Sequence, residues 1–159
     1  MYVSNRRLMN TGQKTNDPTL KAEAKKFLDK HRKMVLTVLD QDGSPNSSLM
    51  LYATDDDFNL YFGTCRCFGK YSALKNDARV AVAVLEEEID PLRVVDIQGK
   101  AEEIPEDKTK ETLKWFESKN PAKYYVKDAE DFVMFKVEPK EVRWLDATSG
   151  ELKIYDLEI

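Results

Sequence analysis

The stretch "FNLYFGTCRCFGKYSALKNDARVAVAV", residues 58–84, changes its hydrophobic pattern twice. Phe58, Leu60 and Phe62 recur at every second position, which predicts a strand that places them on one face. Residues 70–77 read as a short helix, and residues 79–87 form an apolar, β-branched run that predicts a second strand. The stretch therefore predicts a strand, a polar turn, a short helix and another strand.

The polar turn carries the residues with the clearest functional pattern. Lys70 lies in the first turn of the predicted helix, where a cation opposes the helix macrodipole at a cost of about 0.3–1 kcal/mol. An anion between the lysine and the free N–H groups of the helix would reverse that cost. Thr64 could donate a hydrogen bond, Gly69 would let the backbone approach, and Arg66 could serve as a second phosphate ligand. The alternative is a surface lysine whose side chain extends into solvent after a tight turn.

The rest of the chain continues the alternation of short strands and a few helices. Helices are predicted at 19–31 and 105–120, and strands at 34–40, 47–54, 93–104, 132–139, 141–147 and 151–159. Many short strands separated by turn residues favour a mainly β barrel with flanking helices over a doubly wound parallel sheet. Strands 34–40 and 79–87 have few polar positions, so helices or a second subunit should cover both their faces. Gly99 predicts a bulge or bend.

Length and composition limit the classes of protein. The chain has 159 residues, which suits a single domain at 19–159 after a polar arm at 1–18, either flexible or ordered by a partner. The net charge of −4 argues against a nucleic-acid binder, because no basic excess is present to neutralise phosphates. No segment approaches a membrane span, and the N-terminus lacks the apolar centre of a signal peptide. We therefore expect a cytoplasmic protein that binds neither nucleic acid nor membrane.

Order and spacing of several segments resemble a known family. The segments are "VLTVLDQDGSPNSSLMLYATDDDFNLYFGT", "GKYSALKNDARVAVAV" and "VVDIQGKAEEI", with a looser match at "EVRWLD". Together they resemble the pyridoxamine 5'-phosphate oxidase-like proteins, the FMN-binding split barrels. The resemblance implies a six-stranded Greek-key split barrel that forms a homodimer with FMN at the subunit interface.

The resemblance also implies a set of cofactor-binding residues. Ser48, Leu49, Met50 and Leu51 would follow the edge of the isoalloxazine ring, largely through backbone groups. Thr64 and Lys70 would meet the ribityl-phosphate end. The predicted set is completed by Cys65 and Arg66 in the cofactor loop and by Trp144, which would reach the flavin from the other subunit. The glutamine that the family uses beside the flavin falls on Val94, so Gln98, four residues on and on the same strand face, is predicted in its place.

This chain also departs from the family pattern. Phe68 and Gly69 stand where the vitamin-processing oxidases have a serine and an arginine that bind phosphate, so Arg66 would have to substitute for them. Ser48 and Ala53 stand where those enzymes have an arginine and a lysine. Their C-terminal Arg-x-His substrate motif is absent from "ELKIYDLEI", and we therefore do not expect oxidation of pyridoxamine phosphate.

The cysteines and the single histidine have simpler interpretations. Cys65 and Cys67 are expected to be thiols beside the cofactor loop, since a disulfide across one intervening residue is strained. A reactive thiol of low pKa near Arg66 is the alternative. His31 is expected to cap the end of its helix. No Cys or His cluster completes a zinc site, so no metal is predicted.

Two functions remain open at this point, beside a third reading in which the chain is a relative of the fold whose site has become purely structural. The first is an FMN-dependent oxidoreductase that acts on a small substrate, in which the flavin carries the electrons and the protein holds and tunes the ring. The second is a non-catalytic protein that binds flavin, haem or a deazaflavin as a carrier or sensor. Neither the substrate nor the electron donor follows from the sequence.

Overall fold

The computed structural model describes residues 12–120 and 130–159. Its helices are α2 (Pro18–Lys30), α3 (Gly69–Asn76) and α4 (Glu106–Lys119). Its strands are β1 (Gln13–Thr15), β2 (Lys33–Leu39), β3 (Pro45–Leu51), β4 (Ala53–Thr54), β5 (Leu60–Cys65), β6 (Arg79–Leu85), β7 (Arg93–Glu103), β8 (Phe132–Asp146) and β9 (Lys153–Leu157). The strand, short helix and strand predicted from residues 58–84 are thus β5, α3 and β6.

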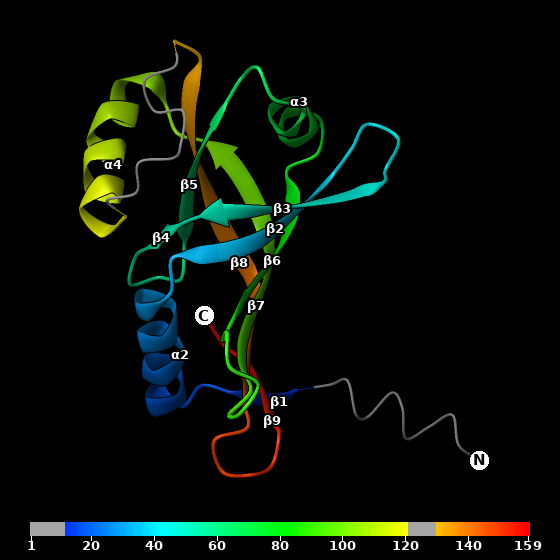
Figure 1. Cartoon of the computed structure of the whole chain (residues 1–159), viewed down its shortest axis with the longest axis vertical. Coiled ribbons are helices and arrows are strands. Elements are labelled where there is room, and N and C mark those ends of the chain that lie inside the picture. Colours follow the sequence, from blue (N-terminus) through cyan, green and yellow to red (C-terminus); the bar gives the residue numbers. More distant parts are fainter. Residues whose placement is uncertain (1–11, 121–129) are drawn as a thin grey trace.

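The strand pairings close into a barrel. β2 pairs with β3 and β6, β7 joins β6 to β8, and β8 joins β7 to β5, all antiparallel. β4 follows β3 after the single residue Tyr52 and pairs with β5. Counting β3 and β4 as one interrupted strand, the ring is β2, β3/β4, β5, β8, β7 and β6, which confirms the predicted barrel. β9 and β1 extend the sheet beyond β8, and Figure 1 shows α2 and α4 on the same side of the sheet.

Two glycines have conformations or surroundings that only glycine tolerates. Gly43, in the turn between β2 and β3, has a φ of 82°. Gly99 marks a shift in register between β7 and β8, where an added Cβ would lie 2.2 Å from the carbonyl oxygen of Glu138. The predicted bulge at Gly99 is therefore confirmed, and it places Pro139 opposite the irregular position of the ladder, where a missing N–H is tolerated.

The structure differs from the expected element pattern in two places. The two strands predicted at 132–139 and 141–147 are one strand, β8, which pairs with β5 through its first half and with β9 through its second. The bulge opposite Pro139 allows the strand to continue past the proline. In the N-terminal segment, β1 runs parallel to β9, so the chain's own C-terminal strand orders residues 13–15.

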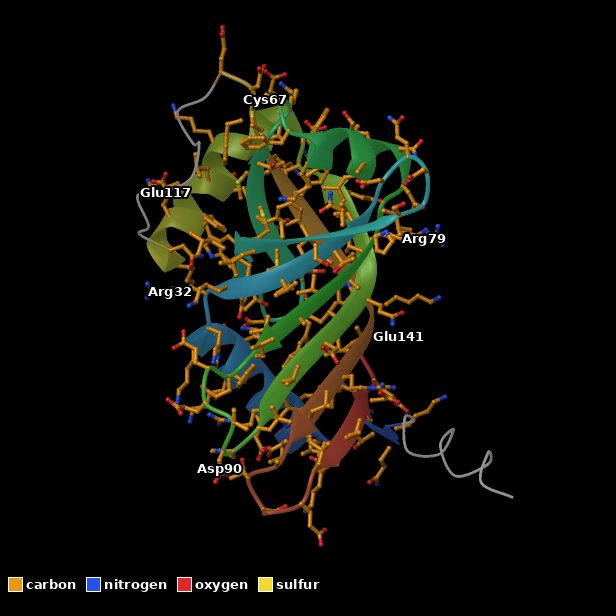
Figure 2. All side chains as sticks on the ribbon, turned by 45° about the vertical axis from the view of Figure 1, so that its right-hand side comes forward. Arg32, Cys67, Arg79, Asp90, Glu117 and Glu141 are labelled. Carbon is orange, nitrogen blue, oxygen red and sulfur yellow. A yellow bond between two sulfur atoms is a disulfide. The ribbon has the colours of Figure 1, made fainter. Side chains whose placement is uncertain are left out.

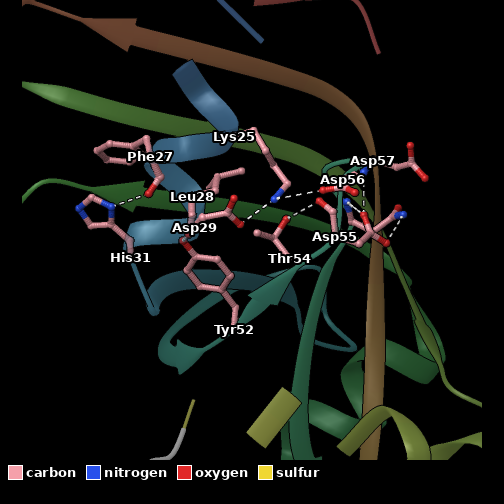
Figure 3. A network of polar contacts seen from close by, with 11 residues as sticks. Lys25, Phe27, Leu28, Asp29, His31, Tyr52, Thr54, Asp55, Asp56 and Asp57 are labelled. Carbon is pink, nitrogen blue, oxygen red and sulfur yellow. Dashed lines mark hydrogen bonds and ion pairs between the residues drawn. The ribbon is translucent and has the colours of Figure 1, made fainter. Parts of the chain in front are cut away.

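Tyr52, between β3 and β4, is bonded in three directions. Its N–H donates to the carbonyl of Arg32 at 3.0 Å, and its hydroxyl donates to the carbonyl of Leu28 in α2 at 2.7 Å. Its own carbonyl accepts from the amide Nδ2 of Asn120 at 2.6 Å. Figure 3 shows the Tyr52 ring reaching α2 beside the contacts of Lys25 with Asp29 and Asp56. These bonds, which we call the Tyr52 junction, hold both flanking helices to the barrel where β3 ends.

The predicted C-terminal cap of α2 is confirmed. His31 ends the helix, and its Nδ1 lies 2.7 Å from the carbonyl oxygen of Phe27, one turn earlier. The other ring nitrogen lies 3.3 Å from Glu86. In the described ranges, no helix is long and apolar enough to cross a membrane.

Candidate functional site

The turn between β5 and α3 leaves the beginning of a helix open. Phe68 is the N-cap residue of α3, and its side chain makes no capping hydrogen bond. Such a helix end carries N–H groups without intrahelical partners and the positive end of the dipole. A Cβ added at Gly69 would meet nothing within 4 Å, so the protein itself does not require glycine there and the space beside it is open. The helix end is therefore available to an anion.

Lys70 points from this helix end into a partly apolar setting. Its Nζ lies 3.0 Å from the thioether sulfur of Met50 on β3, and the side chain is half-buried. Desolvation by burial lowers the pKa of Lys70 below its ordinary value. Over residues 12–120 and 130–159 no carboxylate comes within ion-pair distance of it. Among the residues that the structure describes, this half-buried cation therefore faces a weak acceptor and no anion.

β3 supplies two further unsatisfied features beside Lys70. The hydroxyl of Ser48 is buried, and it has no hydrogen-bond partner in the part of the chain that the structure describes. Ser48 and Met50 lie two residues apart and therefore face the same side of the strand. β3 pairs with β2 along one edge, and no described strand pairs with its other edge. An open edge presents backbone N–H and C=O groups to a ligand.

Thr64 and Phe68 lie on either side of the cysteine pair. Thr64 is a buried residue near the end of β5, on the same face as Phe62. Phe68 is 49% exposed, so its ring does not occupy the interior beneath the turn. The replacement of the family's serine by Phe68 therefore removes a hydroxyl donor without filling the site.

Arg66 has a partner within the chain. Its guanidinium lies 3.3 Å from Glu103 at the end of β7, and the same carboxylate accepts from Tyr71 and Lys75 of α3. Burial alone would raise the pKa of Glu103, but the hydrogen bonds from Lys75 and Tyr71 lower it. The expectation that Arg66 replaces the missing phosphate ligands is thus opposed by its pairing. Glu103 could not be predicted from the sequence as a partner of Arg66, because the strand that carries it meets α3 only in the folded barrel.

Cys65 and Cys67 correct the expectation of two thiols. The structure joins their sulfurs in a disulfide, and the N–H of Cys67 donates to the sulfur of Cys65 at 3.2 Å. The C-x-C spacing brings both side chains to one side of the turn after β5, with a Cα separation of 5.1 Å, within the range that a disulfide spans. The Cys65 sulfur is thereby engaged within the turn.

Gln98 and Leu49 lie on the outer face of the barrel. The register places Gln98 opposite Ala81, and Leu49 opposite Val35, across the β7, β6, β2 and β3 ladder. Gln98 lines a groove of about 750 Å³ on this face. Because side chains alternate along β3, Leu49 faces away from Ser48 and Met50. The structure therefore divides the predicted residues between an inner group around Lys70 and an outer pair, Leu49 and Gln98, of which Gln98 lines the groove.

Leu51 and Trp144 are packed within the chain. Leu51 lies against the cluster that contains Phe116 of α4. Trp144 is 2% exposed and packs on Phe27 of α2, with ring centroids 5.1 Å apart. Within this chain Trp144 is therefore a core residue, and its contact with a cofactor in another subunit stays a prediction. Trp115 packs against Tyr61, with ring centroids 5.0 Å apart.

Comparison with known proteins gives the same family as the sequence. Residues 20–146 match the family described as pyridoxamine 5'-phosphate oxidase. No curated protein sequence matches the chain.

Three solved structures illustrate the likeness of fold. A conserved hypothetical protein of Mycobacterium tuberculosis is 23% identical with a TM-score of 0.72, over 89% of this chain and 94% of the other. An FAD-binding protein of Mesorhizobium loti is 24% identical with a TM-score of 0.64, over 76% and 88%. A heme-binding protein of Mycobacterium smegmatis is 21% identical with a TM-score of 0.72, over 88% and 59%. On its fold and the match over residues 20–146, the chain belongs to the pyridoxamine 5'-phosphate oxidase family.

Proposed function

We propose that the protein binds FMN in a homodimer and acts as an oxidoreductase on a small substrate. The observation that carries the proposal is Lys70, a half-buried cation that meets a thioether and no described carboxylate. It lies beside a helix end without a side-chain cap. A phosphate monoester supplies the charge and the acceptor oxygens that both features lack.

The donor set also suits the remainder of FMN. The open edge of β3 offers backbone groups to the polar edge of a flavin ring, and the unpartnered hydroxyl of Ser48 lies on the same strand. Bound flavin would carry the electrons of the reaction. The contribution of this chain is to bind the phosphate, orient the ring and exclude water. None of the described residues needs to be assigned as a catalytic acid or base.

The outer face of the barrel supports the dimer. Leu49 is 67% exposed, and it forms a row with Val35 and Ala83 across three neighbouring strands. Contiguous apolar positions on a sheet face are typical of an interaction surface. Sedimentation of Leu49→Lys is expected to show a shift towards monomer. Ile89→Lys, at a loop position that is 86% exposed, serves as the control and is expected to sediment like the wild type.

The test of the proposal compares FMN with riboflavin, which lacks the phosphate. Titration followed by quenching of flavin fluorescence is expected to show tighter binding of FMN by the wild type. Lys70→Ala should weaken FMN by about 5- to 150-fold, as loss of a charge-assisted hydrogen bond worth about 1–3 kcal/mol implies, and leave riboflavin unchanged. Lys75→Ala, on the same helix but paired with Glu103, is the matched control and should change neither affinity.

Three outcomes would contradict the proposal: equal affinity for FMN and riboflavin, an equal loss of both in Lys70→Ala, or a Soret band in the purified protein. The last would point to haem, as in the heme-binding relative.

His31, the single histidine, has partners on both ring nitrogens, so ligation of haem by it would require breaking the helix cap. Bleaching of bound flavin by a nicotinamide donor, followed by reoxidation, would separate an enzyme from a carrier.

A further inference from the structure

The disulfide in the β5–α3 turn joins a buried sulfur to an accessible one. Cys65 is the last residue of β5 and is 2% exposed, whereas Cys67 is an exposed residue of the turn. Figure 2 shows Cys67 at one end of the molecule, far from Asp90 at the other. A reagent in solution therefore meets the sulfur of Cys67 first.

The bridge contributes little to holding the fold together. It closes a loop with one residue between the cysteines, and the entropy removed from the unfolded chain falls as the closed loop shortens. The backbone of the turn is already held by other bonds. The N–H of Arg66 donates to the carbonyl of Asp131 at 3.0 Å, and the N–H of Phe68 donates to the carbonyl of Cys65 at 3.1 Å. The disulfide between Cys65 and Cys67 is therefore better explained by a chemical role of the sulfurs than by a contribution to stability.

We propose that Cys65 and Cys67 form a redox site that exchanges with small thiols in solution, independently of any flavin. The thiolate of a small thiol attacks the sulfur of Cys67, a new S–S bond forms, and the Cys65–Cys67 bond breaks. Cys65 leaves as a thiolate, which the N–H of Cys67 stabilises because it already donates to that sulfur at 3.2 Å.

A second thiol completes the exchange. Its thiolate attacks the external sulfur of the mixed disulfide and releases Cys67. The protein disulfide has then gained two electrons and, with the two protons of the small thiols, become two cysteine thiols. The two small thiols have lost the same electrons and become one disulfide.

The two sulfurs differ in their exposure to solvent, and glutathione can be used as a probe to test that difference. Cys65→Ser leaves the accessible sulfur, and Cys67→Ser leaves the buried one. On exposure to oxidised glutathione, Cys65→Ser is expected to gain one glutathione by mass at least about tenfold faster than Cys67→Ser. In mixtures of reduced and oxidised glutathione, the wild type should convert between no thiols and two thiols in one step, as counted by alkylation and mass spectrometry.

Two controls allow the proposal to be tested even if one of the cysteine variants folds poorly. Circular dichroism establishes the fold of each variant. Independently, wild type treated with limiting glutathione and quenched in acid should carry the trapped glutathione on Cys67 in a peptide map. The proposal is overturned if the wild type keeps the same thiol content at every glutathione ratio. Equal modification rates of the two variants, or glutathione trapped on Cys65, would also overturn it.

Discussion

The Tyr52 junction and the β5–α3 turn both lie where a strand of the barrel ends, yet they treat polar groups in opposite ways. At the junction, the N–H, carbonyl and hydroxyl of Tyr52 are all bonded to other elements. At the turn, α3 has no side-chain cap and Lys70 faces the sulfur of Met50. The first arrangement favours the folded state. The second costs stability, a cost that the proposed phosphate ligand would offset.

Removal of the Tyr52 side chain is expected to have the largest effect on stability. Tyr52→Ala deletes a buried ring and its hydrogen bond to α2, which should lower the free energy of unfolding by about 3–5 kcal/mol. Urea unfolding followed by circular dichroism measures the change. Lys110→Ala, at an exposed position of α4, is the control and should stay within about 0.5 kcal/mol of the wild type. If Tyr52→Ala were as stable as that control, the Tyr52 junction would not stabilise the fold.

Asn120→Ala tests one bond of the junction alone. Its Nδ2 donates to the carbonyl of Tyr52, and its loss leaves that carbonyl unsatisfied at a cost of about 1–2 kcal/mol. The effect is smaller than that of Tyr52→Ala because little apolar area is lost. Urea unfolding of Asn120→Ala beside Lys114→Ala, at an exposed position of α4, separates the bond from helix propensity. Equal unfolding midpoints for the two variants would show that the bond contributes nothing.

The sequence predicted the barrel because each of its strands carries its own local signal. The period-two pattern of β5, the continuous apolar run of β6 and the turn at Gly43 require no knowledge of distant residues. The extension of β8 past Pro139 escaped prediction, because it depends on a bulge at Gly99 in another strand.

The site was predicted only in part for the same reason. Lys70 was recognised because its position in a helix can be read locally. The partner of Arg66 could not be read, since Glu103 follows it by 37 positions and meets it only when β7 is beside α3. Nor did the family resemblance reveal the core position of Trp144, which depends on α2 covering it.

Replacement of Lys70 is expected to raise the stability of the ligand-free protein, whereas replacements at the Tyr52 junction lower it. Lys70→Met removes a half-buried charge and keeps an unbranched side chain beside Met50. In the absence of ligand, the variant should be more stable than the wild type by about 0.5–1 kcal/mol, as is common when a functional site is relieved of strain or charge. Urea unfolding of ligand-free protein measures the change, with Lys75→Met as the control. A loss of stability in Lys70→Met would mean that the lysine has a structural role.

The smallest expected effect is the pH dependence of the difference in stability between the wild type and Lys70→Met. Desolvation lowers the pKa of Lys70 in the folded state below its ordinary value of 10.5, which the unfolded chain keeps. Below the folded pKa the lysine is charged in both states, and the wild type bears the full penalty of burying the charge. Between the folded pKa and 10.5 the unfolded state holds more protons, so the stability of the wild type rises with pH relative to Lys70→Met.

The stability gap between the two proteins should therefore narrow as pH approaches 10.5 from below and stay constant above it. Parallel urea unfolding of ligand-free wild type and Lys70→Met from about pH 8 to about pH 11 measures the gap, and every other titrating group cancels in the difference. A gap that widens with pH would mean that the ammonium is stabilised in the folded chain by an anionic group. Lys70 would then already have its partner, and the β5–α3 turn would need no ligand to complete it.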